Sequence, residues 1–153
     1  ERAGARVREH AAHLLLEQLG QRSREATLNV FASDVDTDAL NFARAGSYPE
    51  AIVAEIGPQR LARFFEKQGD RYVVRKALRE SVVFSPQDLV RDPPFSKLDL
   101  IVCRNVLIYF EPVQQGRVLE VFHFALNPHG VLFLGKSQSL GEQADLFEPV
   151  SRT

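Results

Sequence analysis

The sequence has no methionine, no tryptophan and a single cysteine, Cys103. One cysteine cannot form an internal disulfide, a pattern that fits a reducing compartment and predicts a cytoplasmic protein. No apolar run approaches the roughly 20 residues that a membrane-spanning helix requires, and the N-terminus shows no signal-peptide pattern, so we expect no membrane insertion. Because even position 1 is not methionine, the chain is expected to begin inside a longer translated protein.

An excess of either charge is also missing, since 19 Lys and Arg residues oppose 20 Asp and Glu residues. A protein that mainly grips nucleic acid needs a basic surface, so no nucleic-acid partner is expected. What is present is a composition of 44% hydrophobic and 25% charged residues, which is typical of globular proteins and excludes a disordered chain. The length of 153 residues predicts one domain, residues 1–153, with an adequate core.

Short apolar runs alternate with amphipathic segments along the chain. Buried strands are predicted at 28–33, 82–84, 98–103 and 131–134, and helices at 7–19, 37–45, 59–67 and 112–126. For the helix at 37–45, Asp36 or Thr37 is the candidate N-cap and Gly46 the C-terminal stop. This alternation predicts the α/β class, with a mainly parallel sheet covered on both faces.

The stretch 47–80 departs from that alternation. Pro58 opens its helix, the turn at 68–70 follows, and 71–75 has the composition of a strand. We therefore expect a small helix-plus-hairpin insertion in the main fold. A turn is predicted at 127–130 from the sequence Asn-Pro-His-Gly.

Candidate ligand-binding residues follow the apolar strands, because open parallel sheets bind ligands beyond the carboxyl ends of their strands. Asp34 follows the first strand, and a carboxylate there can accept from two vicinal ribose hydroxyls. The alternative for Asp34 is a turn or helix-capping aspartate. Asp88, or its neighbour Gln87, could accept from an adenine amino group, although most loop aspartates have no such role.

Arg104 and Asn105 follow the strand at 98–103. They could orient a carboxylate or close a cofactor site, or Arg104 could instead form a structural ion pair with Asp99 or Asp34. Cys103 is interpreted as a small buried hydrophobe, because nothing near it in the sequence suggests a histidine that would lower its pKa.

No metal site is predicted. The four histidines do not have the spacing of metal ligands, and no other residues complete a site around them. Three aromatic residues near the C-terminal helix and strand are expected to lie in the core: Phe122, Phe124 and Phe133.

Four blocks of the sequence carry a resemblance: VFASDVD at 30–36, ARAGSY at 43–48, LDLIVCRNVLIYF at 98–110 and NPHGVLFLG at 127–135. From about residue 7 to 150, the chain resembles the chemotaxis receptor methyltransferase (CheR) family, with CRNVLIYF as the most specific block. The stretches YPEAIVAEI, RLARFFEKQGDRYVVRK and RDPPFSKLDL resemble most the branch that is fused to methylesterase (CheB) and sensor domains. Such a fusion would also explain the missing initiator.

The resemblance implies a Rossmann-like fold and transfer of a methyl group from S-adenosylmethionine to glutamate side chains of a chemoreceptor's helical bundle, leaving S-adenosylhomocysteine. Carried over by position, Asp34 would hold the ribose, and Asp88 and Leu89 would lie against the adenine. Arg104 and Asn105 would line the cofactor site near the methionine end. Tyr109 would stand near the transferred methyl group, and Tyr109 or Arg104 would orient the substrate carboxylate.

This interpretation requires Asp34, Asp88 and the pair Arg104 and Asn105 to converge around one nucleoside-shaped hollow. The insertion at 47–80 would be the family's β-subdomain. Its loop at 66–71 is shorter than in members that dock on a receptor's C-terminal pentapeptide, so docking of that kind is not expected.

The N-terminus departs from the family pattern. Family members have a first strand and a glycine-rich cofactor loop before the helix that matches 9–19, and residues 1–6 contain neither. The family's N-terminal helical domain and final strand are absent too, so we expect a fold truncated at both ends. Without that first strand, a neighbouring strand would expose unpaired N–H and C=O groups, or the sheet would rearrange.

Two other functions remain open. One is a non-catalytic cofactor-binding or regulatory module derived from such a methyltransferase, which the missing glycine-rich loop favours. The other is a nicotinamide-dependent oxidoreductase, because an acidic residue at a strand end also suits that cofactor's ribose. The absence of Gly-x-Gly-x-x-Gly and the presence of CRNVLIYF count against the second alternative.

Overall fold

The computed structural model describes residues 27–150. The chain forms two compact units that divide between Gln87 and Asp88, and each is described here by itself. The predicted helix at 7–19 lies outside the described residues, and the single-domain organisation stays a prediction. Within residues 27–150, no helix is long and apolar enough to cross a membrane.

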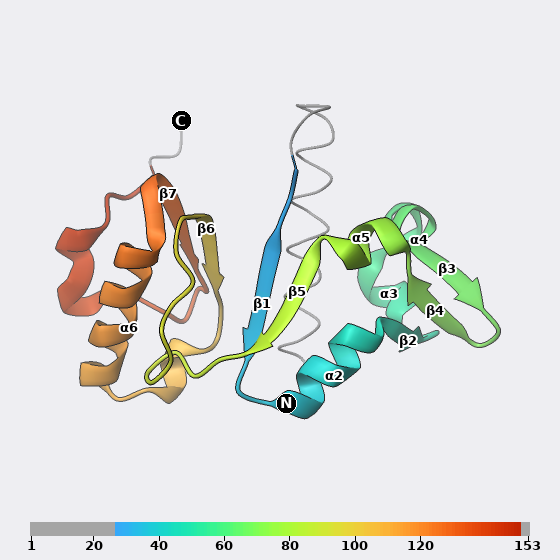
Figure 1. The fold of residues 1–153 in the computed structure, drawn as a ribbon, viewed down its shortest axis with the longest axis horizontal. Helices are drawn as coiled ribbons and strands as arrows, with labels where there is room; N and C mark the ends of the chain where they lie inside the picture. The colour runs from blue at the N-terminus through green and yellow to red at the C-terminus, as the bar shows by residue number, and fades with distance from the viewer. Residues whose placement is uncertain (1–26, 151–153) are drawn as a thin grey trace. The chain divides into compact units, whose positions relative to one another are not determined.

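A parallel pair of strands and one helix form the framework of the first unit (Figure 1). Strand β1 (Val30–Asp34) pairs with β5 (Val82–Pro86) over its whole length, from Val30 opposite Val82 to Asp34 opposite Pro86. Helix α2 (Thr37–Ala45) follows β1 and packs against both strands. Arg44 reaches from this helix to β5, where its Nη2 donates to the carbonyl of Phe84 at 3.0 Å.

Both ends of α2 are set by residues that the sequence singled out. Asp36, rather than Thr37, is the N-cap, because its Oδ1 accepts from the backbone N–H groups of Asp38 at 2.9 Å and Ala39 at 3.1 Å. Gly46 ends the helix with φ +61°, a left-handed conformation that glycine adopts without steric cost. The predicted bounds of this helix are confirmed.

The stretch after α2 forms an antiparallel sheet in the order β2-β4-β3, with short helices beside it. Its elements are β2 (Ser47–Pro49), α3 (Ile52–Ile56), α4 (Pro58–Phe64), β3 (Phe65–Gln68), β4 (Arg71–Val74) and α5 (Lys76–Glu80). They enclose a core of their own, made of Tyr48, Ile52, Ile56, Leu61, Phe64, Phe65 and Leu78. Helices α3 and α5 were not predicted.

The predicted end of the helix at 59–67 is wrong. Helix α4 ends at Phe64, and Phe65 begins β3, where it lies opposite Val74 and is 3% exposed. Burial of Phe65 in the sheet therefore decides the boundary, because local helix propensity is weak compared with tertiary packing.

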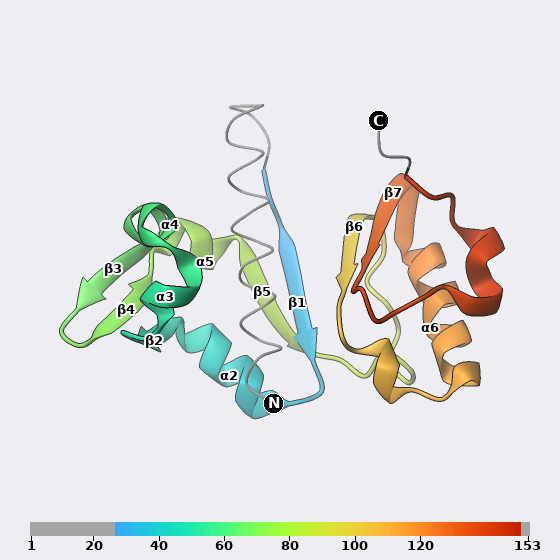
Figure 2. The same cartoon turned by 180° about the vertical axis from the view of Figure 1, so that it is seen from behind.

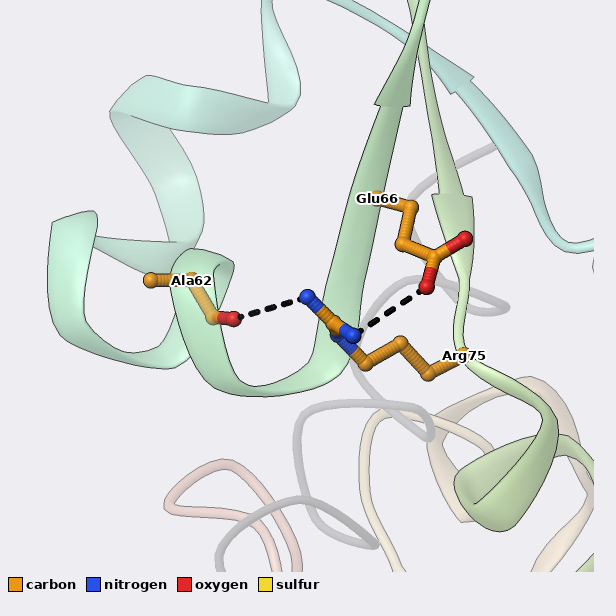
Figure 3. A network of polar contacts seen from close by, with 3 residues as sticks. All are labelled: Ala62, Glu66 and Arg75. Carbon is orange, nitrogen blue, oxygen red and sulfur yellow. Dashed lines mark hydrogen bonds and ion pairs between the residues drawn. The ribbon is translucent and has the colours of Figure 1, made fainter.

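Arg75, directly after β4, joins two other segments of this stretch (Figure 3). Its Nη1 lies 3.1 Å from Oε1 of Glu66 on β3, and its Nη2 donates to the carbonyl of Ala62 on α4 at 3.4 Å. These two contacts connect the end of β4 to the last turn of α4 and to the start of β3.

The second unit is a parallel strand pair packed against a helix (Figure 2). It contains β6 (Leu98–Cys103), the short 3-10 helix η1 (Leu107–Tyr109), α6 (Pro112–Ala125), β7 (Leu126–Leu134) and the 3-10 helix η2 (Gly141–Leu146). Its core is formed by Cys103, Leu107, Val118, Leu119 and Phe122. The predicted strand at 98–103 is confirmed, and so is the helix predicted at 112–126, except that it ends at Ala125 because Leu126 begins β7.

Strand β7 begins earlier than predicted. Leu126 already pairs with Leu98, whereas the next registered pair is Leu100 with Val131. Residues 127–130, predicted as a turn before the strand, are therefore an irregularity within β7, where His129 has φ +68°. The pairing of β7 with β6 therefore resumes on the far side of these four residues, which do not separate the helix from the strand.

The core assignment of the three aromatic residues is right for one and wrong for two. Phe122 is 6% exposed, but Phe124 is 77% and Phe133 is 53% exposed. Phe124 falls outside the face of α6 that Val118 and Phe122 bury, since residues two apart on a helix point in different directions. Phe133 alternates along β7 with half-buried neighbours, so it points away from the covered face.

Candidate functional site

The carboxyl ends of β1 and β5 bring together two polar residues, Asp34 and Gln87. The backbone N–H of Gln87 donates to the carbonyl of Asp34 at 3.0 Å, just beyond the last registered pair of the two strands. Gln87 is only 9% exposed, and Asp34 is half-buried. The backbones of Asp34 and Gln87 are therefore joined at one edge of the strand pair.

Asp34 also takes part in a turn. Its Oδ1 accepts from the backbone N–H of Asp36 at 3.2 Å, which is the hydrogen bond of an Asx turn. The alternative that Asp34 caps the following helix is wrong, because Asp36 does so. A carboxylate has about four acceptor sites on its two oxygens, so the turn and a ribose-binding role are compatible.

Asp88 lies in a tight loop that begins the second unit. Its Oδ1 accepts from the backbone N–H of Val90 at 2.9 Å, and its own backbone N–H donates to Oδ2 of Asp92 at 2.7 Å. Arg91 Nε lies 3.7 Å from its Oδ2. Leu89, half-buried, packs against the core of the unit. These contacts hold the loop in one shape and orient both predicted adenine neighbours.

Arg104 is exposed, and within residues 27–150 its side chain has no ion-pair or hydrogen-bond partner. Asp99, which the sequence offered as a partner, instead accepts at 2.8 Å from Nδ2 of Asn127. The alternative of a structural ion pair between Arg104 and Asp99 is therefore wrong. The guanidinium is left available for an anionic group.

The residue after Arg104 has an unusual backbone. Asn105 has φ +56°, and its N–H donates to Oε1 of Gln138 at 3.0 Å. Gln138 was not predicted as a site residue. The signal in the sequence is weak: a glycine, Gly135, halts a strand, and a glutamine stands three positions later.

Tyr109 is the last residue of η1 and is 82% exposed. Ile108, directly before it, and Val113, four positions later, are also exposed, by 47% and 70%. Leu107 of the same turn is 1% exposed and anchors η1 in the core. The phenol is therefore exposed on a turn that is anchored in the core.

Cys103 is 5% exposed and belongs to the core of the second unit, in line with its interpretation as a buried hydrophobe. In the part of the chain that the structure describes, no three His, Cys, Asp or Glu residues are grouped so that they could hold a metal ion.

A hollow of about 580 Å³ lies in the 47–80 stretch, on the side where α4 meets β3 and β4. It is lined by Pro58, Leu61, Ala62, Phe65, Glu66, Lys67, Tyr72 and Arg75. Beside it, Lys67 Nζ donates to Glu50 at 2.9 Å, and this hydrogen bond raises the pKa of Lys67 above its ordinary value. The hollow contains none of the residues predicted for cofactor binding.

The residues at the strand ends fit a nucleoside cofactor in chemical terms. Asp34 supplies a carboxylate for vicinal hydroxyls, and Leu89 supplies half-buried apolar surface. At the end of β7, a Cβ on Gly135 would lie 3.1 Å from Oε1 of Gln138 and 3.2 Å from Oδ1 of Asn105, so a larger residue would require these side chains to shift by a few tenths of an ångström. The convergence of Asp34 with Asp88, Arg104 and Asn105 stays a prediction.

Two kinds of similarity place the chain among known proteins. Residues 10–153 match the family model described as "CheR methyltransferase, SAM binding domain". The chain is also 39% identical over 140 residues to the "Uncharacterized 104.1 kDa protein in hypE 3'region" of Rhodobacter capsulatus, an alignment that covers 92% of this chain and 15% of that protein.

Shorter relatives have names that describe their activity. The chain is 39% identical to "Chemotaxis protein methyltransferase 1" of Vibrio cholerae over 81% of its length, and 38% identical to "Chemotaxis protein methyltransferase" of Escherichia coli K12 over 72%. It spans 46% and 41% of those two proteins, so it covers less than half of their length. The chain therefore belongs to the CheR methyltransferase family, and the part it contains is the family's α/β, Rossmann-like S-adenosylmethionine-binding domain.

Proposed function

We propose that this chain forms the cofactor-binding part of a methyltransferase that converts glutamate side chains of chemoreceptors to methyl esters. The observation that carries the proposal is the match of residues 10–153 to the cofactor-binding domain of the CheR family. The names of the Vibrio cholerae and Escherichia coli relatives support a role in chemotaxis.

Five residues would bind the cofactor. Asp34 would accept from the ribose hydroxyls, while Asp88 and Leu89 would contact the adenine. Arg104 and Asn105 would lie near the methionine end. In support, Asp34 is half-buried at a strand end, Leu89 is part of a shaped loop, and Asn105 has its backbone held by a hydrogen bond.

The reaction makes small demands on the protein. When bound, S-adenosylmethionine supplies an electrophilic methyl carbon, which bonds to a glutamate oxygen as its bond to sulfur breaks and S-adenosylhomocysteine keeps the electron pair. No general base is required, because a glutamate with an ordinary pKa near 4.3 is already ionised at neutral pH. Arg104 would attract that carboxylate, and Tyr109 would orient it. Correct alignment alone can supply roughly 7–11 kcal/mol of the barrier.

The proposed partner is the helical bundle of a chemoreceptor, in the cytoplasm. We also propose that the natural protein joins this domain to methylesterase or sensor domains. The support is the Rhodobacter capsulatus relative, of which the chain covers only 15%. Arg104 and Tyr109 are both exposed in the segment that follows β6, and a cation and a phenol open to solvent suit a macromolecular substrate that carries carboxylates.

Calorimetry on the natural protein that carries this sequence tests the cofactor assignment, with S-adenosylhomocysteine and NAD as ligands. We expect binding of S-adenosylhomocysteine alone. Asp34→Asn should weaken this binding about tenfold or more, because the amide can keep the turn to Asp36 but loses the charge that strengthens the ribose hydrogen bonds. Asp38→Asn, a neutral change at a nearby exposed acid, is the matched control.

Binding of NAD without S-adenosylhomocysteine would overturn the proposal. Transfer is tested separately, with a base-labile methyl label on purified chemoreceptors. Cofactor binding without any label transfer would favour the non-catalytic module instead.

A further inference from the structure

Gln138 connects the carboxyl ends of the two strands of the second unit. Its Oε1 accepts from the backbone N–H of Asn105 and from that of Gly135, both at 3.0 Å. Gly135 directly follows β7, and Asn105 lies just past the end of β6, whose last registered pair joins Cys103 to Leu134. One side chain thus holds both strand ends where ligands of parallel sheets bind.

The two N–H groups differ in how much they depend on Gln138. Gly135 also donates to the carbonyl of Cys103 at 3.2 Å, so it has a second acceptor. For Asn105, Gln138 is the acceptor within residues 27–150. The turn that presents this acceptor closes on itself, because Gln138 N donates to the carbonyl of Gly135 at 3.0 Å.

Asn105 needs such a contact because of its backbone. Its φ of +56° lies in the left-handed region, which non-glycine residues enter at a cost, although asparagine tolerates it better than most. This conformation sets the direction of the Asn105 side chain and of the chain that leaves Arg104. Loss of the hydrogen bond would free the residue to return to a more ordinary conformation.

The role of the Gln138 side chain is not simply to fill space in the core. Because two N–H groups point at it, the atom facing them must be the oxygen, and Nε2 points the other way. Nε2 is fully buried and has no hydrogen-bond partner within the described residues. An apolar side chain of similar size would avoid this unpaired donor, so the useful atom is Oε1.

We propose that Gln138 is a positioning residue for cofactor binding: it holds Asn105 in its left-handed conformation, so that the Asn105 side chain faces the cofactor. This inference rests on the proposed function of the strand ends, and it adds a residue that acts through Asn105 without touching the cofactor itself.

The test compares variants of the natural protein by their affinity for S-adenosylhomocysteine. Gln138→Leu keeps the volume and removes the acceptor, and we expect about tenfold weaker binding. Gln138→Glu should retain most of the affinity, since a carboxylate oxygen can accept both N–H groups. Gln143→Ala is the control: this half-buried glutamine packs over Gly116 on α6 and should change stability without changing affinity.

A double-mutant cycle separates positioning from general damage. In an Asn105→Ala background, Gln138→Leu should cause no further loss of affinity. Unchanged affinity in Gln138→Leu alone, or the same loss in both backgrounds, would overturn the proposal.

Hydrogen exchange provides a readout that does not need the cofactor. The Asn105 amide should be protected in the wild type and in Gln138→Glu, and should exchange at least tenfold faster in Gln138→Leu. Exchange at the same rate in all three proteins would refute the holding role. If the Asn105 amide of the wild type is protected but the protein binds no S-adenosylhomocysteine, the proposed function is wrong, whereas the hydrogen bond from Asn105 to Gln138 is established.

Discussion

Phe122 and Phe124 stand two positions apart on α6, yet Phe122 is 6% exposed and Phe124 is 77% exposed. The helix turns about 100° per residue, so the two rings leave it in different directions. Only Phe122 joins the core with Val118 and Leu119.

This difference predicts unequal costs for the same substitution. Phe122→Ala should destabilise the protein by about 3–5 kcal/mol, through lost burial and a cavity. Phe124→Ala should change the free energy of unfolding by no more than about 0.5 kcal/mol. Urea unfolding of the two variants measures the difference, and equal losses would show that Phe124 is buried in solution.

The N-cap of α2 predicts a second pair of variants. Asp36→Ala removes the acceptor for the N–H groups of Asp38 and Ala39 and should cost about 1 kcal/mol. Asp38→Ala, in the first turn of the same helix, removes a charge of the same sign without removing a capping bond, so it should cost less. Thermal unfolding compares them, and a larger loss in Asp38→Ala would contradict the assignment of the cap.

Arg75 makes one contact that Glu66 does not share, the hydrogen bond to the carbonyl of Ala62. Both charged side chains are about half exposed, so their ion pair should contribute less than about 1 kcal/mol. We therefore expect Arg75→Ala to be more destabilising than Glu66→Ala, and only Glu66→Ala to become neutral at high salt. Unfolding at low and high ionic strength tests this, and identical losses would argue against the bond to Ala62.

The Lys67 and Glu50 pair predicts a dependence on alkaline pH. The hydrogen bond from Lys67 to Glu50 raises the pKa of Lys67 in the folded protein. The stabilisation is therefore fully present below the unfolded pKa of about 10.4 and is lost as pH rises through the higher folded pKa. The difference in Tm between wild type and Glu50→Gln should shrink across that window, and a constant difference would exclude this cause.

Substitution of Tyr109 should affect activity without affecting stability. Its side chain is exposed on an anchored turn, so Tyr109→Ala should leave Tm unchanged. If the phenol orients the substrate carboxylate, methyl transfer to chemoreceptors should fall by about tenfold or more, since positioning is the main source of rate. Tyr72→Phe, in the other unit, serves as the control, and normal transfer by Tyr109→Ala would remove Tyr109 from the site.

Several features of the fold could be predicted from local patterns. The helix at 37–45 has an acidic cap before it, an apolar stripe along it and a glycine after it, and all three signals lie within one short stretch. The strand at 98–103 is an apolar run interrupted only by Asp99. In each case the signals that predict the element lie within it or directly beside it in the sequence.

Other features escaped prediction because distant residues decide them. Phe65 leaves α4 for a sheet because Val74 provides a partner, and residues 127–130 fall within β7 because Leu98 pairs with Leu126. Gln138 matters through Asn105, which is 33 positions away along the chain. No pattern within a short window contains that information.

The sequence alone determined the α/β class, the family and the residue types at the strand ends, because periodic hydrophobicity and short sequence motifs are local properties of the chain. The tertiary structure decided which aspartate caps α2, which phenylalanine is buried, and which side chain accepts the N–H of Asn105. These outcomes depend on burial and hydrogen-bond geometry, and both are set only when segments far apart in sequence meet in space.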